Sequence, residues 1–239
     1  MNIDVFKKNH YNRRELLTFI SLFGVMGTIS FLLNGCNFYR GFRQIEGEVF
    51  LNGRRVSSEQ MKGPEGVSVP SDASISTGAQ ASAVFVIGRD AFLMRENSRV
   101  ELNPNLLDRK KNEISGFNLS SGAILSVFAR KKRTLRTLSA LIGIRGTGVY
   151  IETDSDKTYV CTCYGTSYMQ VIDSPEINET VTTLYHDQPR SIYSREKRID
   201  HAPVINHSDQ ELILLERLVG RVPPFVKQQR DEGRGSNGY

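Results

Sequence analysis

Apolar and polar residues alternate through most of residues 40–173, in short runs separated by Gly, Asn, Asp and Ser. A period of two places successive side chains on opposite faces of a strand, so these runs predict short β-strands. The predicted strands lie in the ranges 47–56, 66–69, 73–77, 82–95, 97–102, 114–129, 141–153, 157–165 and 167–172. Many short strands at regular spacing favour a mainly β domain, either a twisted β-sandwich or a short β-roll.

Turn residues divide these runs further. Asn52-Gly53 predicts a two-residue hairpin turn, because both central positions of the favoured turn need positive φ. Gly88-Arg89-Asp90 and Ser120-Ser121-Gly122 predict two more turns between strands. Around the turn at Gly88 we expect four apolar side chains on one face of the sheet, by alternation. These are Val84, Val86, Phe92 and Met94.

The pattern changes after residue 173, where charge increases and periodicity weakens, so residues 174–226 are expected to form a C-terminal segment. One α-helix is predicted over residues 209–219, with Ser208 as its N-cap and Glu211 completing a capping box. Its apolar stripe is Leu212, Leu215, Leu218 and Val219. Gly220 and Pro223-Pro224 end the helix. The helix and Phe225 are expected to seal this segment onto the sheet, followed by a disordered tail over residues 227–239.

The N-terminus carries a targeting or anchoring signal, predicted over residues 1–36. Basic residues precede an uncharged apolar run over residues 16–33, which is typical of an export signal or a membrane anchor. Leu33-Asn34-Gly35-Cys36 resembles a bacterial lipobox, which predicts lipidation of Cys36; a retained single-span anchor is the alternative. Both place the remaining chain in the periplasm, attached to the bacterial inner membrane. The pair Arg13-Arg14 resembles a twin-arginine export signal.

Charge excludes one large class of function. With 31 Lys+Arg against 26 Asp+Glu the net charge is +5, and the charges are spread along the chain. A nucleic-acid-binding protein usually has a broad basic face with aromatic residues set among the charges. The densest basic cluster, Arg130–Arg133, is short and is interpreted as a solvated turn between strands. No nucleic-acid partner is expected.

Several segments resemble the FecR-type domain of bacterial envelope proteins, over residues 47–172. The most specific is Ile144-Arg145-Gly146-Thr147-Gly148-Val149, similar to the family's V/I-R-G-T-x-F/V strand; residues 68–87, 119–128 and 163–171 resemble further family elements. In this motif the glycines permit close strand approach or a bulge, and Thr147 can bond to neighbouring backbone. Arg145 is expected to bridge carbonyls or a carboxylate inside the fold.

The resemblance implies a periplasmic sensing, scaffolding or protein-interaction module with an unidentified envelope protein as its partner. The family's best-known members also carry a cytoplasmic anti-sigma segment before their membrane helix. Only residues 1–15 precede the apolar run here, so no such segment is expected in this chain.

The cysteines and histidines suggest an alternative function. Cys161 and Cys163 stand two apart, so on a strand both thiols face the same side, with Cα atoms about 6.6 Å apart, long for a disulfide. His186, His201 and His207 follow within one short stretch. If this stretch folds back over the last strands, thiols and imidazoles together would suit Zn²⁺ or copper.

The simpler interpretation is that the thiols are buried as small apolar groups and the histidines lie in turns and caps. It leaves the domain without a cofactor. The chain contains no recognisable catalytic motif, so we expect no enzyme. The leading hypothesis is a membrane-tethered interaction module, and a metal-binding or redox accessory protein is the alternative.

Overall fold

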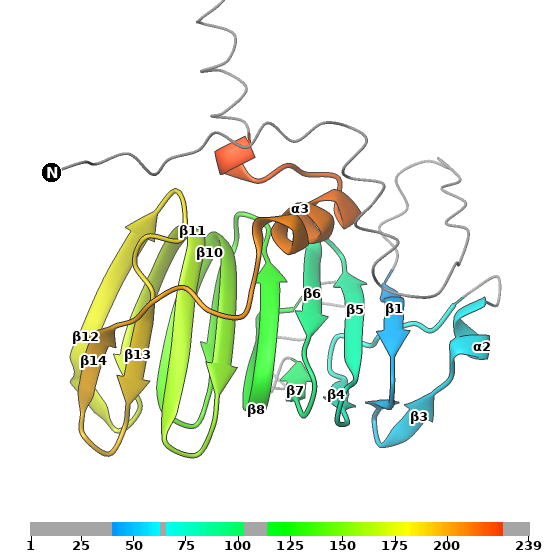
Figure 1. Cartoon of the computed structure of the whole chain (residues 1–239), viewed down its shortest axis with the longest axis horizontal. Helices are drawn as coiled ribbons and strands as arrows, with labels where there is room; N and C mark the ends of the chain where they lie inside the picture. Colours follow the sequence, from blue (N-terminus) through cyan, green and yellow to red (C-terminus); the bar gives the residue numbers. More distant parts are fainter. Residues whose placement is uncertain (1–39, 63–65, 103–113, 227–239) are drawn as a thin grey trace, which may run out of the picture. The chain divides into compact units, whose positions relative to one another are not determined.

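The computed structural model describes residues 40–62, 66–102 and 114–226 (Figure 1). The apolar run, Cys36 and the tail over residues 227–239 lie outside the described residues. Where the structure is described, it contains no helix with the length and apolarity needed to cross a membrane. The fold is mainly β with a C-terminal helix, which confirms the predicted fold class.

The described strands join into one hydrogen-bonded network of fourteen members. The first seven strands along the chain are β1 (Gly41–Glu46), β2 (Val49–Leu51), β3 (Arg54–Val56), β4 (Ser74–Thr77), β5 (Ser82–Ile87), β6 (Asp90–Met94) and β7 (Arg99–Leu102). The later strands are β8 (Gly116–Val127), β9 (Lys132–Arg136), β10 (Ala140–Thr153), β11 (Lys157–Val171), β12 (Ser174–Thr183), β13 (Arg190–Tyr193) and β14 (Arg198–His201). The helices are α2 (Ser58–Lys62) and α3 (Asp209–Leu218).

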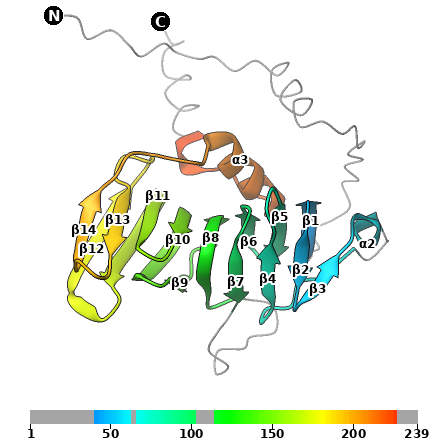
Figure 2. The ribbon, with the colours of Figure 1, turned by 60° about the horizontal axis from the view of Figure 1, so that its bottom comes forward.

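Three long strands divide this network into two layers, because each pairs with different neighbours along its two halves (Figure 2). The first half of β8 pairs with β7 and β9, and its second half pairs with β6 and β10. Strand β10 changes partner from β9 to β8, and β11 changes from β13 to β12. Each change falls at a glycine with positive φ, namely Gly122, Gly146 and Gly165.

We call the two layers the front and back layers. The front layer contains β1, β5, β6, the second halves of β8 and β10, the first half of β11, β13 and β14. The back layer contains β3, β2, β4, β7, β9, β12 and the remaining halves of the long strands.

Both faces of the front layer are buried at β5. Phe85 and Ile87 of β5 belong to the core cluster that also contains back-layer residues such as Ile75. Val84 and Val86 alternate with them and pack in a second cluster with Leu212 and Leu215 of α3. The helix therefore covers the front layer on the side away from the back layer (Figures 1 and 2).

The predicted hairpin at Asn52-Gly53 is confirmed, with φ of 51° and 78°. The prediction that Val84, Val86, Phe92 and Met94 share a face is wrong. Only Gly88 and Arg89 separate β5 from β6, so Val84 pairs with Leu93 and Val86 with Ala91. Directly paired residues point to the same side, which leaves Phe92 and Met94 on the opposite face.

The predicted turn at Ser120-Ser121-Gly122 is instead a bend within continuous β8. A Cβ on Gly122 would lie 2.3 Å from the Ser98 hydroxyl oxygen, so the bend also needs glycine for close approach. Residues 157–171 likewise form one bent strand, β11, rather than two. Beyond residue 173 the sheet continues through β12, β13 and β14, so the sheet extends past the predicted boundary.

The helix prediction matches α3 closely. The capping box of Ser208 and Glu211 is present, Val219 is the C-cap, and Gly220 has a φ of 70°. Leu212, Leu215, Val219 and Phe225 are buried as predicted, whereas Leu218 of the predicted stripe is only half-buried.

The FecR-like motif lies at the bend of β10. The ladder shifts register between Arg145 and Gly148, and the Thr147 hydroxyl donates to the Thr166 carbonyl over 3.0 Å, so the expected bulge and backbone bond are present. Ile144 is buried, but Arg145 is exposed, and its expected place inside the fold is wrong. The basic cluster also differs from expectation, because Arg133 is buried in an ion pair with Asp90.

Candidate metal centre

Two cysteines and two histidines meet between the front layer and the C-terminal segment. Cys161 and Cys163 lie in the first half of β11 and face the same side, as their spacing predicts, towards the cluster that contains α3. His186 comes from the connection between β12 and β13, and His207 precedes α3. Their four ligand atoms all lie within 4.8 Å of one another. The sequence placed all four among the candidate ligands.

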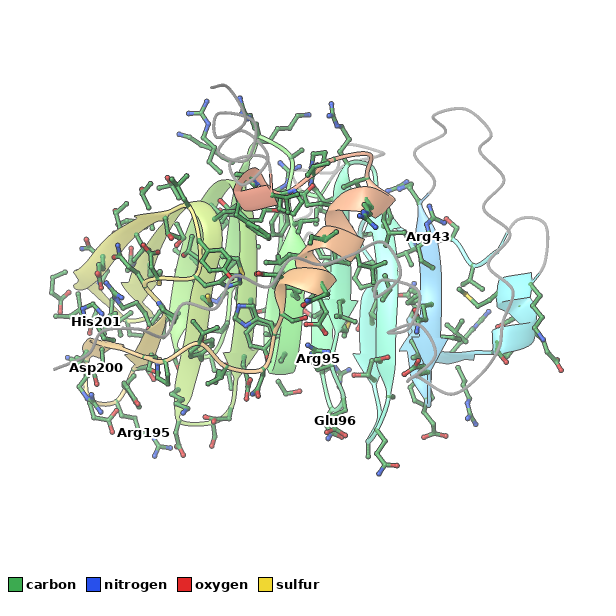
Figure 3. All side chains as sticks on the ribbon, turned by 45° about the horizontal axis from the view of Figure 1, so that its top comes forward. Arg43, Arg95, Glu96, Arg195, Asp200 and His201 are labelled. Atoms are coloured by element: carbon green, nitrogen blue, oxygen red, sulfur yellow. The ribbon has the colours of Figure 1, made fainter. Side chains whose placement is uncertain are left out.

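His201, the fifth candidate, does not join this group. It ends β14, where Figure 3 shows it beside Asp200 at the outer end of the sheet. Its Nδ1 atom accepts a hydrogen bond from Arg190 over 3.0 Å. His201 is therefore an exposed strand-end residue in an ion-pair network with Arg190 and Glu179.

Hydrogen bonds on the outer side of the two imidazoles fix their orientation. His186 Nε2 lies 3.1 Å from a carboxylate oxygen of Asp209, and His207 Nδ1 lies 2.6 Å from the Ile205 carbonyl oxygen. A carboxylate and a carbonyl only accept hydrogen bonds, so both of these ring nitrogens carry the N–H. In the neutral rings, His186 Nδ1 and His207 Nε2 then have bare lone pairs.

Those two bare nitrogens face each other. His186 Nδ1 lies 3.0 Å from His207 Nε2 and 3.6 Å from Cys161 Sγ. Three electron-rich atoms at these distances require a cation, either a metal ion or a proton on one ring. In a tetrahedral Zn²⁺ site with Zn–N near 2.0 Å and Zn–S near 2.3 Å, the N–N and N–S edges are about 3.3 and about 3.5 Å. The two separations from His186 Nδ1 are close to these edges, and all four ligand atoms lie within 4.8 Å of one another.

The electrostatics of the cluster favour thiolate and imidazolium forms. The Cys163 thiol, with help from His186 and His207, holds the pKa of Cys161 well below its usual range. Burial opposes charge on His186, but its bonds to Asp209 and Cys161 raise the pKa of His186 to about 9. Burial raises the pKa of Cys163. The cluster thus favours a thiolate at Cys161 beside a protonated His186, and a metal ion would have to displace that proton to bind His186 Nδ1.

Surrounding side chains hold the ligands in place. Tyr150 stacks on His207 with ring centroids 4.7 Å apart, and the Tyr185 hydroxyl donates to the second oxygen of Asp209 over 2.8 Å. Ligand histidines in metal sites usually donate their outer N–H to a carboxylate or a carbonyl, and both arrangements occur here. The sequence did not point to Asp209 or Tyr150 as part of the site. An acidic residue directly after the N-cap Ser208 is ordinary in the first turn of a helix, so Asp209 did not stand out as a partner of His186.

Comparisons with known proteins found no matching family model and no matching curated protein. Among solved structures, two crystal structures described as a putative anti-sigma factor from Parabacteroides distasonis ATCC 8503, at 2.50 and 1.65 Å resolution, are similar. Each has a TM-score of 0.44, with 12% and 11% sequence identity. Each alignment covers 58% of this chain and 62% of the matched chain, less than two thirds of its length. The function proposed below rests on this chain's own residues.

Proposed function

We propose that this chain is a membrane-tethered periplasmic protein that binds one metal ion through Cys161, Cys163, His186 and His207. The observation that carries the proposal is the pair of bare ring nitrogens 3.0 Å apart, aimed at a thiol by hydrogen bonds on their far sides. These hydrogen bonds leave His186 Nδ1 and His207 Nε2 facing the thiol of Cys161, which is the orientation that a shared metal ion needs.

The ligand set favours Zn²⁺ over copper. Two thiolates and two imidazoles with no further position are the composition of a closed, four-coordinate zinc site. Both cysteines and His186 are buried, and His207 is half-buried, so the centre is closed to bulk water. The thiols bind as thiolates, so uptake of Zn²⁺ releases protons to the solvent. The closed shell makes a structural rather than a catalytic role the stronger hypothesis.

An enzymatic role is disfavoured by the same burial. Cys161, His186 and Asp209 form a thiol–imidazole–carboxylate chain, which is the order of a cysteine nucleophile and its base. However, Cys161 has no exposed surface, and it lies in the cluster that α3 covers. A nucleophile must reach its substrate, so we propose that the chain is not an enzyme.

The periplasmic location is supported by the N-terminal sequence pattern, whichever of lipidation at Cys36 or a retained anchor holds the chain. In that oxidising compartment unpaired thiols are at risk, and a metal would protect Cys161 and Cys163. The FecR-like resemblance suggests that the domain senses or contacts another envelope protein, and that role stays a prediction.

Elemental analysis of the detergent-solubilised full chain tests the metal site. We expect about one zinc per chain in the wild type, and loss of zinc in Cys161→Ser and His207→Ala. His201→Ala is the matched control, because His201 lies outside the cluster, and it should keep its zinc. Cobalt substitution should give the thiolate charge-transfer band and the intense visible bands of a tetrahedral site. Zinc-free wild-type protein, or retention of zinc by both ligand variants, would refute the site.

A protease added to spheroplasts tests the location. We expect the β domain to be degraded while the inner membrane stays intact, and to fractionate with membranes before digestion. A cytoplasmic protein serves as the control for leakage. Protection of the domain until the membrane is lysed would contradict the proposed topology.

A further inference from the structure

The metal ligands belong to three separate parts of the chain. Cys161 and Cys163 are in the sheet, His186 is in the β12–β13 connection, and His207 belongs to residues 202–226, which we call the closing segment. The closing segment contains α3 and lies over the front layer (Figure 1). An ion bound to all four ligands would therefore tie the closing segment to the sheet at one point.

The other attachments of the closing segment are spread along it. Tyr159 of β11 donates from its hydroxyl to the Pro203 carbonyl and accepts from the Ile205 amide. Arg95 pairs with Glu211 at 2.7 Å, and Figure 3 shows Arg95 near the start of α3. Tyr164 donates to Glu216 near the end of the helix. These contacts all depend on the closing segment being docked.

The helix itself is short. With 10 residues, α3 is below the roughly 12–15 residues at which an isolated helix becomes even marginal in water. It is stabilised by packing of Leu212 and Leu215 against the front layer rather than by propensity. When the closing segment leaves the sheet, α3 is therefore expected to unfold.

The charge pattern gives the metal control over docking. With the segment docked, bare nitrogens of His186 and His207 face each other at 3.0 Å, close to the Cys161 sulfur. A cation between these atoms turns their repulsion into attraction. Without the metal, the closing segment loses this tie and keeps only its separate contacts with Tyr159, Arg95 and Tyr164.

We infer that the metal acts as a latch: bound metal holds residues 202–226 closed over the front layer, and its loss releases this segment and uncovers an apolar sheet face. The inference rests on the proposed zinc site. It adds that the site regulates a conformational change, so the domain would report metal availability through the position of its C-terminal segment.

Hydrogen exchange on the full chain in detergent, with zinc and after removal of zinc by a chelator, tests the latch. We expect amides of residues 208–219 to exchange at least about tenfold faster without zinc, since they lose the helix. Amides of β5, β6 and β8 should stay protected within about twofold. His207→Ala should reproduce the zinc-free pattern, and His201→Ala should behave as the wild type.

The possible outcomes distinguish failure of the latch from failure of the proposed zinc site. If zinc binds stoichiometrically but its removal leaves exchange over residues 208–219 unchanged, the latch is refuted and the site stands. Equal loss of protection over the helix and the sheet also refutes the latch, because the metal then supports the whole domain. Absence of zinc from the wild type refutes both.

Thermodynamic linkage between zinc binding and closure supplies a second test, which leaves all four metal ligands unchanged. If zinc favours the closed state, weakening closure must weaken zinc binding by the same factor. Leu215→Ala removes a fully buried side chain of α3, whereas Leu214→Ala makes the same change at a side chain that is 45% exposed. Leu215→Ala should lower zinc affinity by about tenfold or more, and Leu214→Ala by less than about twofold. Equal affinities in the two variants would overturn the latch.

Discussion

At the scale of single residues, Asp209 controls which nitrogen of His186 is available. Its carboxylate lies 3.1 Å from His186 Nε2 and receives the Tyr185 hydroxyl on its other oxygen. His186 Nδ1 is therefore left bare toward Cys161 and His207. Asp209 contacts no ligand atom on the metal side, so its effect on metal binding is one of orientation and basicity.

Asp209→Asn should weaken zinc binding by about 10- to 100-fold, the usual effect of losing such an outer partner. The amide can still fill the space, but it no longer supplies the negative charge that favours a strongly basic ring. Competition with a chromophoric chelator measures the affinity. Asp200→Asn on β14 is the control and should leave affinity unchanged. An Asp209→Asn affinity equal to the wild type would show that the carboxylate does not tune the site.

Gly148 is constrained by packing rather than by backbone angle. A Cβ at this position would lie 2.5 Å from a ring carbon of Tyr164, whose hydroxyl is bound to buried Glu216. Gly148→Ala should lower the free energy of unfolding by about 1–3 kcal/mol, because Tyr164 has to shift. Gly143→Ala in the same strand meets only the Tyr168 Cβ, at 3.9 Å, and should be nearly neutral. Urea denaturation of both variants measures the difference, and equal stabilities would contradict this packing argument.

Some residue positions followed directly from the sequence. The common direction of Cys161 and Cys163 follows from the two-residue period of a strand, and it is present in the structure. Their approach to His186 and His207 depends on how the chain folds back, which local pattern does not encode. Arg145 was misplaced because a charge among apolar residues suggested burial, whereas alternation along β10 buries Ile142 and Ile144 and places Arg145 on the opposite, exposed face.

At the scale of elements, one buried arginine connects the last three strands of the chain. Arg190 begins β13 and is paired with Glu179 of β12, through bonds of 2.8 and 2.5 Å. The same guanidinium donates to His201 of β14. The side chain of Arg190 therefore links β12, β13 and β14, three strands that the local sequence pattern did not predict.

This link predicts a pH dependence. The hydrogen bonds from Arg190 hold the pKa of Glu179 below its usual range. The carboxylate therefore contributes stability above the unfolded-state pKa, about 4.3, and loses it as the pH falls through the lower folded-state pKa. Glu179→Gln should cost about 1 kcal/mol at pH 7, a figure reduced for the partial exposure of the side chain. The difference from the wild type should shrink in urea denaturation below about pH 4. A constant difference from pH 7 to pH 3 would contradict the assignment.

The helix was predictable and the last strands were not. The capping box, the apolar stripe and the terminal glycine of α3 are local signals, and each is confirmed. Strand β12 exposes Glu176, Asn178 and Thr180, and its inward positions include the polar residues Glu179 and Thr183, so its apolar alternation is weak. Its pairing with β11 comes from tertiary structure, which overrides weak local preference.

At the scale of the whole described domain, Asp90 and Arg133 connect the two layers. Asp90 begins β6 of the front layer, and Arg133 lies in β9 of the back layer, 2.9 Å away. Both side chains are buried, and the carboxylate also accepts from the Ala129 amide. Burial raises the pKa of Asp90 although Arg133 acts in the opposite direction.

Arg133→Met should destabilise the domain by about 3–5 kcal/mol, because it leaves Asp90 buried without its counter-charge. The double variant Asp90→Leu/Arg133→Met should recover much of that loss, since a buried ion pair can often be replaced by apolar side chains. A double-mutant cycle in urea measures the coupling. Independent, additive losses would indicate that the pair does not act as a unit.

The layering itself could be predicted only as a class. Regular strand spacing indicated a sandwich or roll, and the two layers fit that expectation. Two of the three glycine bends, at Gly122 and Gly165, were taken for breaks between strands, so the lengths of β8 and β11 were underestimated, whereas β10 was predicted as one strand. A local pattern does not distinguish a chain that reverses at Gly122 from one that bends and continues.

The order of the ligands along the chain has a consequence for biogenesis. The two thiols are synthesised first, His186 follows, and His207 emerges only after the sheet strands are complete. Unlike a zinc finger, whose ion nucleates a local fold, this centre can capture its ion only when the finished sheet and the last part of the polypeptide meet. At the proposed zinc site, capture of the ion would therefore be the last event of maturation, in whichever compartment the chain folds.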